Sequence, residues 1–171
     1  TIPNVNLLGI YDPDVKRSQY VSKKYKTVAF QSLKKLIRNV DALSIVTPTP
    51  NHYKTAKLCI ENKKHVFIEK PITATLKEAH KLLDLSKNNS TIIQVGHIER
   101  LNPALMALKP FYINPKFIEI QRLAPYTSRG TDVPVVLDKM IHDIDILLSL
   151  VKSEVATLEA TGMSIITDSL D

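Results

Sequence analysis

The sequence predicts an α/β fold in which a doubly wound parallel sheet is followed by part of an α+β domain. Three observations support this class. Short apolar, β-branched runs alternate with segments of helical periodicity along the first half of the chain. Several of these runs are apolar throughout, as expected of parallel strands covered on both faces. Polar or charged residues follow the runs directly, which is where open α/β sheets place their ligands.

The elements follow in a regular order up to Gly96. Strands are expected at residues 6–11, 41–47, 65–68 and 91–96, and helices at 13–24, 32–38, 51–62 and 75–87. Thr75 and Glu78 form a capping box that fixes the start of the fourth helix. Right-handed crossovers between parallel strands would complete a Rossmann-type domain over residues 1–98.

The pattern changes after that boundary. A short helix is expected at 102–109, a half-buried strand at 116–123 and a loop at 124–133. A long helix is expected at 134–151, capped by Thr131 or Asp132, with one or two strands at 155–166. Residues 99–171 are therefore expected to be part of an α+β domain with an open, mainly antiparallel sheet. Both ends of the chain interrupt this pattern, so we expect it to be truncated at each.

Composition excludes several classes of protein. Hydrophobic residues make up 44% and charged residues 23% of the 171 residues, as in ordinary globular proteins. No apolar run reaches the roughly 20 residues that span a bilayer, and no export signal is visible. The charge of +6 is spread over every predicted helix, and no nucleic-acid motif is present. Cys59, the single cysteine, is expected to fill the core of a cytoplasmic protein.

The strand at 65–68 ends in the most informative segment, Glu69-Lys70-Pro71. If the strand lies in an open α/β sheet, Lys70 is delivered to the edge where such sheets bind ligands. Pro71 restricts the lysine towards an extended backbone. The alternative is a strand followed by an ordinary surface turn, which three residues alone do not exclude.

The predicted helix at 134–151 carries a stripe of ionisable residues. Asp138, His142 and Asp145 lie at positions i, i+4 and i+7 and so share one side of a helix. Asp138 is expected to orient His142, which can accept a hydroxyl proton near neutral pH. Asp143 is expected to face solvent. A solvated polar face and a metal site are the alternatives, and metal is discounted because no second histidine or cysteine lies at a helpful spacing.

The first strand ends at Asp12, where an acidic residue commonly binds the adenosine ribose of NAD. A helix N-cap is the alternative role. NAD is expected rather than NADP, because a carboxylate would repel the additional phosphate. The glycine-rich phosphate turn, which lies roughly 20 residues before such an acid, is missing. We therefore expect the strand that normally precedes this one in a Rossmann-type domain to be absent, together with the glycine loop.

The ordered segments together resemble the Gfo/Idh/MocA family of NAD(P)-dependent oxidoreductases. The matching segments are Gly9–Asp14, Asp41–Pro48 with Asn51-His52, Glu69-Lys70-Pro71, and Asp138, His142 and Asp145. The resemblance implies Lys70, His142 and Asp138 as catalytic residues. It also implies a cofactor site lined by Asp12, Thr47, Pro48, Asn51, His52, Glu69 and Pro71, and it implies a homo-oligomer.

Residues 95–104 and 136–145 resemble those members that oxidise the 3-hydroxyl of UDP-N-acetylglucosamine. That narrower resemblance implies a sugar or nucleotide-sugar substrate near Arg100, Asn102 and Asp145, although Arg100 and Asn102 fit a helix start equally well. Lys139 stands where an apolar residue is expected. A non-catalytic nucleotide- or sugar-binding relative of the same fold is the alternative function, and a nucleic-acid module is a distant third.

Overall fold

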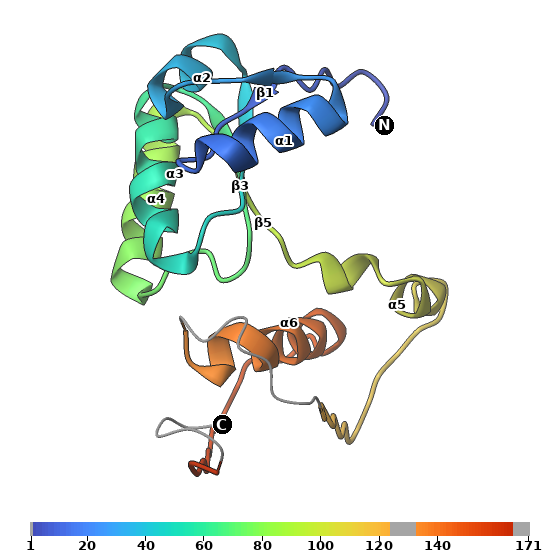
Figure 1. The fold of residues 1–171 in the computed structure, drawn as a ribbon. Coiled ribbons are helices and arrows are strands. Elements are labelled where there is room, and N and C mark those ends of the chain that lie inside the picture. Colours follow the sequence, from blue (N-terminus) through green and yellow to red (C-terminus); the bar gives the residue numbers. More distant parts are fainter. Residues whose placement is uncertain (1, 124–132, 166–171) are drawn as a thin grey trace.

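The computed structural model describes residues 2–123 and 133–165 (Figure 1). The first part of the chain contains five strands: β1 (Gly9–Ile10), β2 (Val28–Ala29), β3 (Ala42–Ile45), β4 (His65–Ile68) and β5 (Ile93–Val95). Four α-helices alternate with them: α1 (Val15–Tyr25), α2 (Leu33–Asn39), α3 (His52–Glu61) and α4 (Leu76–Asn89). This alternation confirms the predicted α/β class. None of the helices in the described ranges is long and apolar enough to cross a membrane.

The strands form two parallel sheets rather than the one expected. β1 pairs with β2, and β4 lies between β3 and β5. The pair β1–β2 joins through only two residue positions and makes no hydrogen bond to β3 within the described part of the chain. β2 was not predicted, since two residues are too few for a period-2 pattern.

The three-stranded sheet has a register that aligns its strand ends. Ile45 in β3 lies opposite Ile68 in β4, which lies opposite Val95 in β5. The backbone continues this alignment by one residue, because Glu69 N–H donates to Ile45 O and Gly96 N–H donates to Ile68 O. The residues that follow the three strands therefore lie side by side at the carboxyl-terminal ends of the strands. Lys70 follows the central strand, β4.

The core lies between this sheet and the helices that pack against it. Its fully buried members include Ile37, Ala56, Cys59, Ile60, Ile68 and Leu82. Cys59 is confirmed as a core residue, and burial raises the pKa of its thiol to about 11. The Thr75 cap also forms as predicted, since Thr75 Oγ1 accepts from Glu78 N–H and donates to the Glu78 carboxylate. The core thus fixes the sheet edge that carries Lys70.

The second part of the chain, from Ile98 onwards, contains helices but no assigned strand in its described residues. After a 3₁₀ turn at Ile98–Leu101, α5 covers Pro103–Leu108. The predicted helix at 134–151 is divided into a π-helical turn, Val136–Met140, and α6, Ile141–Leu150. The proposed caps Thr131 and Asp132 lie outside the described residues. Figure 1 shows α5 and α6 set apart from α1–α4.

The strands predicted at 116–123 and 155–166 are wrong over their described residues, which carry no strand. The alternating pattern indicates a face suited to burial, but a strand also needs a neighbour to complete its hydrogen bonds. Neither segment has one here, and Phe117 and Leu158 are each 82% exposed. The open antiparallel sheet and the domain boundary at residue 98 remain predictions.

Candidate active site

Lys70 joins the two parts of the chain. It follows β4, and its side chain is 20% exposed. Its Nζ donates to Asp138 Oδ1 at 2.7 Å and to the Asp138 backbone carbonyl at 2.7 Å. The two residues are 68 positions apart in the sequence. The structure therefore brings the strand-end lysine into contact with Asp138.

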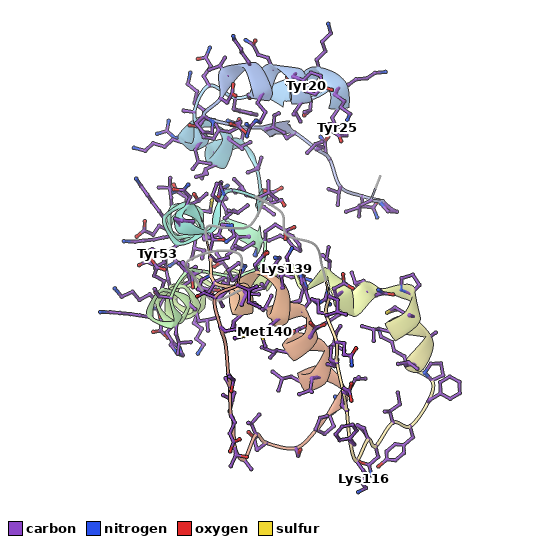
Figure 2. All side chains as sticks on the ribbon, turned by 60° about the horizontal axis from the view of Figure 1, so that its bottom comes forward. Tyr20, Tyr25, Tyr53, Lys116, Lys139 and Met140 are labelled. Atoms are coloured by element: carbon purple, nitrogen blue, oxygen red, sulfur yellow. The ribbon has the colours of Figure 1, made fainter. Side chains whose placement is uncertain are left out.

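The π-helical turn provides the Asp138 side of this contact. Leu137 N–H and Asp138 N–H both donate to Pro134 O as the helix begins. The next residues, Val136–Met140, wind with the wider i to i+5 spacing, which occurs mostly as single turns within α-helices and is frequent at functional sites. Lys139 lies where this helical segment approaches the first part of the chain (Figure 2). Within the turn, Asp138 presents both its carbonyl and its carboxylate to Lys70.

Asp138 lies between two ammonium groups. Lys139 Nζ is 3.3 Å from Asp138 Oδ2, on the opposite oxygen from Lys70. Burial on its own would raise the pKa of Asp138. The hydrogen bond and charge of Lys70, helped by Lys139, outweigh it, and the pKa is lowered. Asp138 is therefore a carboxylate at neutral pH and holds Lys70 in one position.

His142 differs from the expectation that Asp138 would orient it. The Asp138 carboxylate bonds to lysine instead, and His142 Nδ1 is buried without a hydrogen-bond partner in the described structure. Burial is the main cause that lowers the pKa of His142, followed by the charges of Lys70 and Arg122. At neutral pH the ring is therefore uncharged and able to accept a proton.

Asp145 links α6 to the 3₁₀ turn that follows β5. It is 7% exposed and accepts two hydrogen bonds from Arg100, at 2.6 Å from Nε and 2.5 Å from Nη2. The hydrogen bond from Arg100 is the main cause that lowers the pKa of Asp145. Both residues were expected near substrate. The structure brings them together, with the carboxylate buried and the guanidinium side chain 55% exposed.

His97 is a site residue that the sequence analysis missed. It directly follows Gly96 at the end of β5, and its Nδ1 is 3.7 Å from Asp145 Oδ1. That nitrogen is buried and makes no hydrogen bond in the described structure. A surface hollow of about 420 Å³ along β5 is lined in part by His97 and Arg100. The rule that drew attention to Lys70, a polar residue at a strand end, would also have found His97.

Arg122 is the other missed residue. It donates to both oxygens of Asp143 at 2.6 Å, so the expectation that Asp143 faces solvent is wrong. Its hydrogen bond is the main cause that lowers the pKa of Asp143, and its charge also lowers that of His142. No local pattern signals this pairing, because the two residues are 21 positions apart. Asn102 instead caps α5, accepting from Ala104 N–H at 3.0 Å, which favours its helix-start role.

The residues expected at the cofactor lie at or just after strand ends. Asp12 follows β1, accepts from Asp14 N–H at 2.8 Å and lies 3.7 Å from Arg17. The N-cap of α1 is Asp14, so the capping role considered for Asp12 belongs to its neighbour. Thr47 and Pro48 follow β3, with Asn51 closing the next 3₁₀ turn. Glu69 and Pro71 flank Lys70.

The site fits the reacting end of a nicotinamide cofactor, but the chain offers no glycine-rich turn for the cofactor's pyrophosphate. The aligned strand ends and the buried, unpartnered imidazole nitrogens of His97 and His142 suit a reacting centre. The chain has four glycines, Gly9, Gly96, Gly130 and Gly162, and they form no glycine-rich turn for a pyrophosphate. No group of three metal-binding side chains occurs in residues 2–123 and 133–165.

Comparison with known proteins agrees with this architecture. The model of the family described as "Oxidoreductase family, NAD-binding Rossmann fold" matches residues 1–97. A UDP-N-acetylglucosamine 3-dehydrogenase from Acidithiobacillus ferrooxidans is 36% identical over 166 residues, which cover 96% of this chain and 53% of that protein. Its solved structure superposes with a TM-score of 0.90, covering 96% of this chain and 55% of the other.

A second relative, the scyllo-inositol 2-dehydrogenase (NAD(+)) of Bacillus subtilis, is 28% identical over 177 residues. That alignment covers 95% of this chain and 51% of the Bacillus protein. The chain therefore spans about half the length of the curated relatives that it matches.

Proposed function

The chain belongs to the oxidoreductase family with an NAD-binding Rossmann fold, and we propose that it serves the oxidation of a sugar or nucleotide-sugar secondary alcohol with NAD as hydride acceptor. The best candidate substrate is the 3-hydroxyl of UDP-N-acetylglucosamine. The observation that carries the proposal is the contact between Lys70 and Asp138, close to a half-buried His142 whose pKa is lowered mainly by burial and then by the charge of Lys70.

The three residues divide the proton chemistry among them. Oxidation of an alcohol removes a hydride from carbon and a proton from oxygen, and bound NAD supplies the hydride acceptor. His142 takes the hydroxyl proton, since its lowered pKa leaves the ring neutral and able to accept one. The Lys70 ammonium donates two of its three N–H groups to Asp138, and it polarises the hydroxyl with the third. Asp138 keeps the ammonium in place through two bonds of 2.7 Å.

The cofactor residues are proposed from their positions at the strand ends. Asp12 would hold the adenosine ribose, and its charge favours NAD over NADP. Thr47, Pro48, Asn51, Glu69 and Pro71 would lie along the cofactor, with His52 in the same turn region. Asp12 is not the cap of α1, since Asp14 has that role.

The substrate assignment draws on two supports. The Acidithiobacillus relative carries the name of a UDP-N-acetylglucosamine 3-dehydrogenase and matches 96% of this chain. The exposed guanidinium of Arg100 is held by its hydrogen bonds to the buried Asp145 carboxylate. It offers a fixed positive charge beside the hollow along β5. We propose that Arg100 contacts the substrate, that Asp145 acts through Arg100, and that Asn102 contributes from the start of α5. A cytoplasmic homo-oligomer completes the proposal.

The test is turnover by the full-length protein with NAD and a panel of UDP-sugars, hexoses and inositols, followed by NADH absorbance. Lys70→Met and His142→Ala are each expected to lower kcat by about 10²–10⁴-fold. Lys81→Met and His80→Ala, on the exposed face of α4, are the matched controls and keep the parental rate. Binding of NAD and sugar without NADH formation would instead support the non-catalytic alternative. Parental rates in both site variants would refute the residue assignment.

A further inference from the structure

His52 makes two short contacts from a fully buried position. It is the first residue of α3 and is 1% exposed. Its Nδ1 lies 2.8 Å from Pro71 O, and its Nε2 lies 2.8 Å from Thr47 O. With so little surface exposed, the ring has almost none to offer a cofactor. Its place at the strand ends therefore needs another explanation.

Both partners of the ring are carbonyl oxygens, which accept hydrogen bonds and never donate them. The imidazole must therefore be the donor in each contact. A neutral ring has one N–H and can satisfy one carbonyl, whereas a ring with a proton on each nitrogen satisfies both. A polar contact left unsatisfied at a buried position is costly. The two distances of 2.8 Å place both carbonyls within hydrogen-bond reach of the ring, and the nitrogen that carries the proton decides which carbonyl accepts from it.

The two carbonyls belong to neighbouring turns at the functional edge. Thr47 lies in the turn after β3, among the proposed cofactor residues. Pro71 lies in the turn after β4 and is covalently joined to Lys70. The backbone ladder between β3 and β4 ends with the bond from Glu69 N–H to Ile45 O at 3.0 Å. Beyond that bond, the His52 ring links the two turns.

We propose that His52 is a positioning residue that fixes the Lys70 turn against the Thr47 turn without touching substrate or cofactor. Its Pro71 contact would set the place of the Lys70 ammonium, and its Thr47 contact would set the surface along which NAD lies. The kinetic consequences rest on the proposed dehydrogenase function, but the two hydrogen bonds do not.

Two amide variants of the full-length protein separate the contacts. In His52→Asn the amide nitrogen reaches the place of Nδ1, so the Pro71 bond is kept and the Thr47 bond is lost. In His52→Gln it reaches the place of Nε2, with the opposite result. We expect His52→Gln to lower kcat by about 10- to 100-fold with a small change in KM for NAD, because Lys70 loses its support. His52→Asn should mainly raise KM for NAD. Equal effects of both variants on both constants, or no effect, would overturn the proposal.

A measurement on the parental protein keeps the proposal testable if a variant does not fold or no substrate turns over. In ¹⁵N-labelled protein, His52 should show a slowly exchanging ring N–H signal in NMR spectra. A ring N–H that exchanges rapidly with solvent would overturn the inference whatever the activity. A protected signal in a protein inactive on every sugar would support the inference while contradicting the proposed function.

Discussion

The ion pair between Arg100 and Asp145 should respond very differently to removal of each partner. The Arg100 side chain is 55% exposed and the Asp145 side chain 9%. Arg100→Met leaves a buried carboxylate whose remaining ion-pair partner, among residues 2–123 and 133–165, is the His97 nitrogen 3.7 Å away. Lost hydrogen bonds to a charged group cost about 1.5–3 kcal/mol of unfolding free energy. Asp145→Asn leaves a guanidinium that water can solvate, so its cost is expected to stay within about 1 kcal/mol, as for exposed pairs.

Urea unfolding of the parental protein, the two single variants and the double variant measures this difference. The double variant should be more stable than Arg100→Met alone, because the buried charge has gone. Arg122→Met is the matched control. Its partner Asp143 is 16% exposed, so its loss should fall between those of the first two variants. The reasoning is refuted if Asp145→Asn costs as much as Arg100→Met, or if the double variant is the least stable.

Three further predictions concern titration and packing. In Lys70→Met the pKa of His142 should rise, because a charge that lowers it is removed, and NMR titration of the ring would detect the change. Stability should fall as the pH decreases below the usual histidine pKa, because folding lowers the pKa of His142. It should fall further through the pH range in which carboxylates become protonated. The depressed pKa values of Asp138 and Asp145 give stability that is present above pH 3.8 and lost as these groups protonate. Unfolding midpoints measured against pH would show a flat response if these groups are not linked to folding. Gly9→Ala should cost about 1–3 kcal/mol in urea unfolding, because its new methyl carbon would lie 2.7 Å from Val28 O and against the Phe30 ring. Gly96→Ala, whose nearest contacts are side-chain atoms at 3.1 Å, should cost less.

Much of the first part of the chain could be predicted from local patterns. Apolar runs gave β3, β4 and β5, and the strand-end rule singled out Lys70 before any contact was known. The i, i+4, i+7 spacing also placed Asp138, His142 and Asp145 on one side of a helix, and all three lie among the ionisable groups of the site. These features depend on short-range periodicity, which the sequence records directly.

The pairing of charged residues was less predictable. Asp138 was expected to orient His142, its neighbour on the helix, but it bonds to Lys70, 68 positions away. Asp143 was expected in solvent, but it pairs with Arg122. Such choices depend on tertiary distances that no local pattern contains. The same reason explains the segment at 116–123, where alternation describes a face but says nothing of a neighbouring strand.

The Lys70–Asp138 contact makes the proposed chemistry depend on how β4 and the helical segment that begins at Val136 meet. One region supplies the ammonium from a rigid sheet, and the other supplies the carboxylate from a widened helical turn. A substitution far from either residue that tilts α6 would therefore reduce turnover without unfolding the protein or altering the sheet. Rate would then report the alignment of the two regions more sensitively than any stability measurement.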